Sequence, residues 1–186
     1  EYHYNRYILA LGYHANGDLN KAIEMVKRAL EHSPAEVSEE RTDYEAALVR
    51  LLEESGDQAA AEQVYRDTLA ARRLHFPESH LDIASSLDDL GQTLILHEKY
   101  ADAEPYLRKC LEIRKAALPA EEWRIAHTMS VLGTSLVGQG RFTEAEPLLV
   151  RAFHELQANE RRLAGNPLAM VREALDAVVA LYTAWG

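Results

Sequence analysis

Hydrophobic residues recur along most of this chain at the three- and four-residue spacing of amphipathic helices. In one set of stretches the apolar positions are Leu87, Leu90, Leu94, Met129, Leu132 and Leu136, with Leu175, Val178 and Tyr182 near the end of the chain. The stretch with Leu87, Leu90 and Leu94 and the stretch with Met129, Leu132 and Leu136 are each followed, after a short polar segment, by a second amphipathic stretch. The apolar positions of these second stretches are Ala103, Leu107, Cys110, Leu111, Ala145, Leu149, Ala152 and Phe153. The pattern predicts an all-α chain built from consecutive pairs of helices.

The helix pairs repeat along the sequence. Setting Gly133 on Gly91, and Phe142 on Tyr100, aligns two complete pairs with a single offset of 42 residues. The turn inside each pair then falls at Gly17, Gly56, Glu98, Gly140 and Gly186, at spacings of 39, 42, 42 and 46 residues. One helix hairpin cannot bury its own apolar face, whereas a stack of hairpins can. We therefore predict one domain over 1–186, with repeats at approximately 3–34, 42–76, 80–118 and 122–157 and a terminal half repeat at 167–186.

Individual residues refine these elements. Gly91 and Gly133 lie inside predicted first helices, where glycine is unfavourable unless a second helix has to approach closely. Asn20 is expected to be an N-cap, and Thr143 with Glu146 to form a capping box. Cys110 is expected to be a small buried apolar residue. In the terminal helix, Tyr182 and Trp185 are expected to be buried in the core.

The spacing of Gly140, Phe142, Ala145 and Ala152 resembles the tetratricopeptide repeat. The 42-residue period and the stretch His80–Ala84 resemble the kinesin-light-chain subclass, although Leu81 stands where that subclass has proline. The resemblance implies a right-handed α-solenoid of about four hairpins plus a terminal helix, and a role in holding protein partners.

A narrower resemblance concerns the last third of the chain. Residues 138–153 followed by 172–186 are similar to the C-terminal repeat arrays of bacterial serine/threonine protein kinases. The chain has no glycine-rich loop, HRD or DFG motif, so this resemblance implies a repeat tail without its kinase domain. We accordingly expect a fragment of a larger multidomain protein.

In this family the first helices line a concave face, which gives the residues expected to bind a partner. They are Tyr4, Tyr7, His14, Asp43, Arg50, Glu53, Asp88, Asp89, Gln92, His127, Ser130 and Thr134. Two alternatives stay open: Asp88 and Asp89 as solvated surface, and the aromatic residues near the start as a face covered by an upstream repeat. Asp89 and Val131 occupy the position at which kinesin-light-chain repeats carry a peptide-binding asparagine, so that specificity is not inherited here.

Charge and composition narrow the classes of partner. The 186 residues include 30 acidic and 20 basic ones, for a formal charge of −10. This balance argues against nucleic-acid binding, which needs clustered lysine and arginine. Residues 1–57 hold twelve acidic and six basic residues, a net of −6, which favours a basic protein or peptide as the partner.

Several other function classes lack their sequence signals. A single cysteine cannot form an internal disulfide or a cysteine-rich zinc site, and the eight histidines have poor spacing for a metal site. No apolar run is long enough for a membrane helix, and the first residues lack the basic region and the cleavage site of a secretory signal, so we expect a cytoplasmic protein. No P-loop, dinucleotide fingerprint or nucleophile elbow occurs.

The sequence thus predicts a non-enzymatic interaction or scaffolding module, without metal or cofactor, that is a monomer or a weak homo-oligomer. The alternative is a structural array, either self-associating through the aromatic residues at its two ends or regulating an attached kinase domain.

Overall fold

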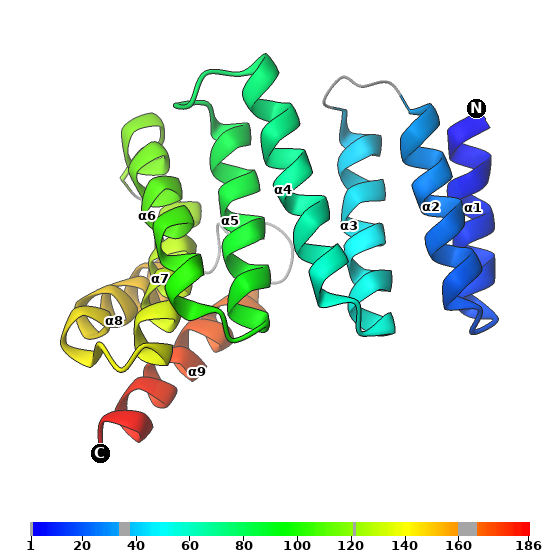
Figure 1. Cartoon of the computed structure of the whole chain (residues 1–186). Helices are drawn as coiled ribbons and strands as arrows, with labels where there is room; N and C mark the ends of the chain where they lie inside the picture. The colour runs from blue at the N-terminus through cyan, green and yellow to red at the C-terminus, as the bar shows by residue number, and fades with distance from the viewer. Residues whose placement is uncertain (1, 34–37, 121, 160–166) are drawn as a thin grey trace. The chain divides into compact units, whose positions relative to one another are not determined.

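A computed structural model describes residues 2–33, 38–120, 122–159 and 167–186, and within these ranges every regular element is an α-helix (Figure 1). The helices are α1 (Tyr2–Ala15), α2 (Leu19–His32), α3 (Glu39–Ser55), α4 (Gln58–His75), α5 (Leu81–Leu96), α6 (Tyr100–Ala117), α7 (Trp123–Gly138), α8 (Phe142–Asn159) and α9 (Pro167–Trp185). They form consecutive hairpins followed by a terminal helix, which confirms the predicted fold class. The chain divides into two compact units, residues 1–74 and 75–186, and each is described by itself. The single domain and the repeat bounds stay predictions.

The five residues predicted at the inter-helix turns all have left-handed backbone conformations. Their φ angles are +78° at Gly17, +81° at Gly56, +59° at Glu98, +73° at Gly140 and +91° at Gly186. Among the described residues no other position has a positive φ. Glycine suits this conformation because it has no Cβ to collide with the backbone. The repeat period read from the sequence is therefore confirmed by the backbone itself.

In residues 75–186 the two complete hairpins close through a glycine–leucine contact. A Cβ added to Gly91 would lie 2.5 Å from Leu107 Cδ2, and one added to Gly133 would lie 2.5 Å from Leu149 Cδ2. The six predicted core positions of α5 and α7, from Leu87 to Leu136, are each at most 1% exposed. Both the core stripe and the close approach are confirmed.

In residues 1–74 the core is a cluster to which α1, α2, α3 and α4 all contribute. Ala10 of α1 and Val26 of α2 are each 1% exposed and belong to this cluster, as do Tyr44 and Leu52 of α3. Tyr7 packs on Tyr44 with ring centroids 4.8 Å apart. Tyr7 therefore contacts the hairpin that follows it in the sequence.

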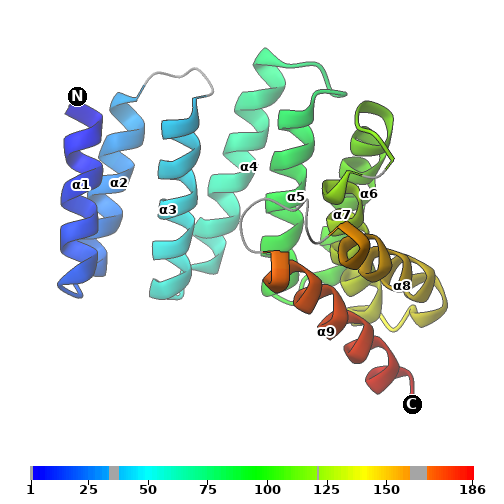
Figure 2. The same ribbon diagram turned by 180° about the vertical axis from the view of Figure 1, so that it is seen from behind.

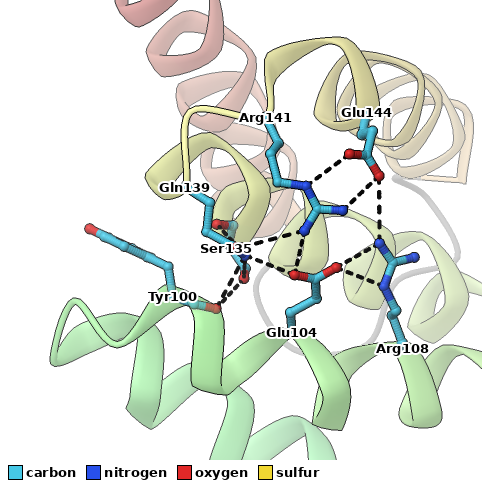
Figure 3. A network of polar contacts seen from close by, with 7 residues as sticks. All are labelled: Tyr100, Glu104, Arg108, Ser135, Gln139, Arg141 and Glu144. Carbon is cyan, nitrogen blue, oxygen red and sulfur yellow. Dashed lines mark hydrogen bonds and ion pairs between the residues drawn. The ribbon is translucent and has the colours of Figure 1, made fainter.

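A polar network joins the third hairpin to the fourth (Figure 3). Glu104 of α6 accepts hydrogen bonds from Arg108 (2.7 Å), Gln139 (3.0 Å) and Arg141 (2.6 Å). Arg141 also donates to Glu144 at 2.7 and 2.8 Å. Two carboxylates and two guanidiniums balance in charge, so the junction is fixed without a net buried charge.

The network shifts the pKa values of its carboxylates. Burial alone would raise the pKa of Glu104, but the hydrogen bonds from Gln139, Arg108 and Arg141 outweigh it and lower that pKa. The hydrogen bonds from Arg141 lower the pKa of Glu144 as well. Both groups therefore favour the folded state in their ionised form.

Two predicted caps are wrong. The N-cap of α2 is Asp18, whose carboxylate accepts from Lys21 N at 3.2 Å, so Asn20 lies inside the helix. Helix α8 begins at Phe142, and Thr143 is therefore also inside it and cannot cap it. In both cases the helix starts earlier than the side-chain pattern suggested.

The predicted core of the terminal helix is displaced by one position. The buried residues of α9 are Ala174 and Leu181, each at most 1% exposed. Leu175, Tyr182 and Trp185 are 43%, 48% and 42% exposed, so the prediction that they are buried is wrong. Among the described residues α9 packs mainly against α7 and α8, and the face that it turns toward these two helices carries Ala174 and Leu181.

Candidate partner-binding groove

The structure has a cavity of about 260 Å³ in residues 75–186, bounded by the first helices α5 and α7, by α9 and by one residue of α8. Figure 2 shows α9 beside these helices at the edge of this unit. The lining residues are Gln92, Ile95, Leu96, His127, Ser130, Val131, Thr134, Leu156, Met170 and Glu173. We refer to these ten residues as the groove.

The groove has an apolar interior and a polar edge. Leu156 and Ser130 are 1% and 8% exposed and form its deepest part, whereas Leu96 at the mouth is 66% exposed. The Thr134 hydroxyl donates to the Ser130 carbonyl at 3.1 Å, so its oxygen remains able to accept a further hydrogen bond. Among the described residues that line the cavity there is no lysine or arginine, and the one carboxylate is that of Glu173.

A buried polar cluster lies beside the groove and reaches it through His127. Arg114 Nη1 donates to Asp88 Oδ2 at 3.0 Å and to the Thr128 hydroxyl at 2.6 Å. His127 Nδ1 lies 3.6 Å from Asp88 Oδ2. Burial, with Asp88 nearby, raises the pKa of the Cys110 thiol to about 12, so this cysteine is the expected inert core residue.

The structure contradicts both predictions made for Asp88, which were a solvated surface group and a partner contact. Each of them requires an accessible carboxylate, whereas Asp88 is only 5% exposed. Arg114 draws it inward. Asp88 Oδ2 accepts from Arg114, but among the described residues no group donates to Asp88 Oδ1.

The other predicted site residues fall into two sets. Gln92, His127, Ser130 and Thr134 come together in the groove, and Asp89 is half-buried on α5 outside its lining. The remaining six lie in residues 1–74, where Tyr4, Asp43 and Arg50 are exposed and Tyr7, His14 and Glu53 are half-buried. In that unit His14 Nε2 lies 2.7 Å from Glu54 Oε2.

Residues 83–121 and 125–154, which span most of the third and fourth hairpins, each match the family model described as the tetratricopeptide repeat. Residues 83–121 and 125–154 are tetratricopeptide repeats. No curated protein matches it. The tetratricopeptide-repeat fold supports a protein–protein interaction module in general, and repeats of this kind are generally non-enzymatic scaffolds.

Solved structures share this tetratricopeptide-repeat fold. A kinesin-light-chain-type protein from Podosopora anserina with nearly identical TPR-like repeats matches at 16% identity and a TM-score of 0.69, covering 97% of this chain and 84% of that one. BtubC (BKLC) from P. vanneervenii matches at 20% identity and a TM-score of 0.72, covering 95% and 70%. The apo form of RapI matches at 13% identity and a TM-score of 0.62, covering 94% and 68%. The predicted likeness to kinesin-light-chain repeats is confirmed for the fold.

Three groove residues were not among the predicted site residues because they lie on neither α5 nor α7. Leu156 lies on the second helix α8, and Met170 and Glu173 come from the start of the terminal helix. The repeat alignment held a signal for Leu156. One period earlier the same position is Arg114, so a long charged residue is replaced by a shorter apolar one.

Across residues 2–33, 38–120, 122–159 and 167–186, no three histidine, cysteine, aspartate or glutamate side chains are grouped so as to hold a metal ion. None of the helices in these ranges is long and apolar enough to cross a membrane.

Proposed function

We propose that this chain binds a segment of a partner protein in the groove, with one large apolar side chain of that segment inserted between α5, α7 and α9. The observation that carries the proposal is the groove itself, because four polar residues expected on the partner-binding face surround one apolar cavity.

The size of the cavity favours a side chain over a free small molecule. Its volume of about 260 Å³ lies below the roughly 300 Å³ at which pockets for drug-sized ligands begin. The deepest atoms belong to the buried Leu156, and the mouth is apolar at Leu96. Leucine, methionine or phenylalanine in the partner would gain most from removal of apolar surface from water.

The edge of the groove would recognise the polar part of the segment. Gln92 can donate and accept hydrogen bonds, and the hydroxyl oxygens of Ser130 and Thr134 can accept from peptide N–H groups. Glu173 is the carboxylate of the lining, and none of the ten described lining residues is a lysine or arginine. A lysine or arginine next to the apolar anchor would therefore be favoured, consistent with the charge of −10 for the whole chain.

Selection from a displayed library of random twelve-residue peptides tests this function. We expect enrichment of peptides that carry a large apolar residue beside a basic one. Leu96→Glu should remove most of this binding, because it brings a carboxylate to the apolar mouth. Leu74→Glu is the matched control, since Leu74 is 84% exposed and does not line the groove, whereas Leu96 is 66% exposed and does.

The selection distinguishes the alternatives. Peptides retained equally by Leu96→Glu and Leu74→Glu would place binding elsewhere on the molecule. Failure to enrich any peptide on the unmodified chain would favour a structural array, attached to other parts of its own protein, over an interaction module with an exchangeable ligand. Glu173→Lys should shift the selected peptides from basic to acidic if Glu173 sets the charge preference.

A further inference from the structure

A second cavity, of about 340 Å³, lies in residues 1–74 between α2, α3 and α4. Figure 1 shows α3 between the other two helices. One residue of α2, three of α3 and four of α4 line this space, and half of these eight residues are polar. The polar ones are an arginine, a glutamate, an aspartate and a threonine. We refer to this space as the α3 cavity.

The α3 cavity lies where the following hairpins have apolar core. The 42-residue period sets Arg41 and Glu45 of α3 on Ile83 and Leu87 of α5, which are at most 1% exposed. An ion pair, with Arg41 Nε 3.2 Å from Glu45 Oε1, therefore stands where α5 has two aliphatic side chains. The fourth hairpin also has buried apolar residues at these positions, and they are Ile125 and Met129.

The opposite wall of the cavity does not refill the space. Val64 and Ala71 of α4 stand at the positions where α6 has the larger Tyr106 and Ile113. A buried ion pair and an unfilled volume each cost folding free energy in a helical core. Their combination at one junction points to a site for another molecule.

Two buried polar side chains of the lining have hydrogen-bonding capacity left over. Glu45 is 8% exposed, and among the described residues its one polar interaction is the ion pair with Arg41. Thr68 is 7% exposed, and no described residue forms a hydrogen bond with its hydroxyl. By contrast, the hydroxyls of Thr42 and Thr134 donate to the carbonyl four residues earlier in their helices. A ligand inside the cavity can therefore bond to both Glu45 and Thr68.

The charges of the lining favour a cation over an anion. Arg41 Nη1 already donates to the Leu30 carbonyl at 3.3 Å and to the Ser33 hydroxyl at 2.9 Å. The exposed Asp67 adds a second carboxylate, so two carboxylates line the cavity against this one guanidinium. The apolar part of the lining, which includes the buried Leu48, suits a methylene chain rather than a bare metal ion.

We propose that the α3 cavity binds an alkylammonium group, that is, a short aliphatic chain that ends in a protonated amine. The ammonium donates to the Glu45 carboxylate and to the Thr68 hydroxyl oxygen, and the chain lies against Leu48 and Val64. Because Glu45 is largely removed from water, its attraction for a cation is screened less than that of a surface carboxylate. Two sources carry this chemistry, namely a lysine side chain of a partner protein and a free diamine.

Titration with n-butylammonium, the analogue of a lysine side chain, tests the site when it is followed by heteronuclear NMR. We expect the amide signals of Glu45, Thr68 and their neighbours to shift. n-Butanol has a hydroxyl in place of the ammonium group and should bind about tenfold more weakly, because hydrogen bonds between charged groups are the stronger ones. Equal affinity for the two compounds would overturn the proposal.

Variants of the lining show whether the shifts come from the α3 cavity. Arg41→Ile/Glu45→Leu copies the third hairpin and should abolish the shifts while circular dichroism stays helical. Thr68→Val keeps the shape of the side chain, and the loss of its hydroxyl should weaken binding about threefold. Asp43→Asn is the control, since Asp43 is exposed on α3 and does not line the cavity. Unchanged binding in the first two variants would place the ligand elsewhere and overturn the proposal.

Two further ligands separate the sources. Putrescine carries an ammonium group at each end, and binding about tenfold tighter than that of n-butylammonium would support the site as one for a free diamine that also reaches Asp67. Equal binding of n-butylammonium and of lysine blocked at its α-amino and carboxyl groups would support it as a site for a lysine side chain. Peptide selection on the groove tests residues 75–186, so either proposal can fail without the other.

Discussion

The hairpins α5–α6 and α7–α8 share one framework and differ where the groove lies. Their cores coincide at the 42-residue offset, with Gly91 matched by Gly133 and Leu107 by Leu149. Other positions change character: Asp88 corresponds to Ser130, Asp89 to Val131, and Arg114 to Leu156. In the third hairpin the charged pair Asp88–Arg114 is buried with an N–O distance of 3.0 Å.

In the fourth hairpin, Ser130 and Leu156 replace that charged pair and form the deepest part of the cavity. A serine and a leucine fill less space than an aspartate and an arginine and carry no charge, so apolar volume is left for another molecule. The matching positions therefore maintain the hairpin, whereas the substituted ones leave an open cavity where the third hairpin has a filled inter-helix space. Each prediction below tests one part of this comparison.

The largest effect is expected from breaking the charged pair. Asp88→Ala leaves Arg114 buried without its carboxylate and should lower the free energy of unfolding by about 3–5 kcal/mol. The double variant Asp88→Ser/Arg114→Leu copies the fourth hairpin and should cost clearly less, because neither charge is then left unpaired. Urea unfolding followed by circular dichroism measures both.

This pair of variants can contradict the comparison directly. If Asp88→Ser/Arg114→Leu were destabilised by more than Asp88→Ala, the third hairpin could not accept the residues of the fourth, and the two would not be interchangeable frameworks. Arg114→Leu alone completes the double-mutant cycle, which isolates the coupling between the two side chains.

A smaller effect is expected at the glycine–leucine contact that the two hairpins share. Gly133→Ala adds a methyl group where Leu149 already packs, and should destabilise by about 1–2 kcal/mol net of the helix propensity gained. Gly12→Ala in α1 is the matched control, because nothing lies within 4 Å of a Cβ there. That variant should stabilise by up to about 1 kcal/mol.

The first hairpin suggests how to rescue the clash. At the positions equivalent to Gly133 and Leu149 it has Ala10 and Val26, and both are buried in one cluster. Gly133→Ala/Leu149→Val copies that pair and should recover much of the lost stability. Thermal unfolding of the three variants would reject the packing argument if Gly133→Ala and Gly12→Ala had effects of the same sign.

The sequence predicted the framework more completely than the groove for a physical reason. Turn glycines and core leucines obey local rules of backbone conformation and helical period, so Gly140 and Leu149 could be placed from their neighbours alone. The position of Asp88 depends on Arg114, 26 residues away, which turns a polar residue inward. The groove also depends on α9. Leu175 was expected on the buried face of this helix, but α9 packs against α7 and α8 through the face that carries Ala174 and Leu181.

The smallest effect concerns the polar network that joins the two hairpins, and it should appear as a dependence on pH. The pKa values of Glu104 and Glu144 are lowered in the folded protein, so these carboxylates stabilise it above their unfolded pKa. That contribution is lost as the pH falls below the ordinary pKa of a glutamate and through the lowered pKa values of the folded state. Gln at position 104 cannot ionise, so the melting temperature of Glu104→Gln should fall less steeply as the pH is lowered.

Glu112→Gln is the control on the same helix, since the Glu112 side chain is 68% exposed. The melting temperature of this variant should follow that of the unmodified protein at each pH. If all three proteins lost stability in parallel, acid would act elsewhere in the molecule and the junction between the hairpins would rest on apolar packing alone.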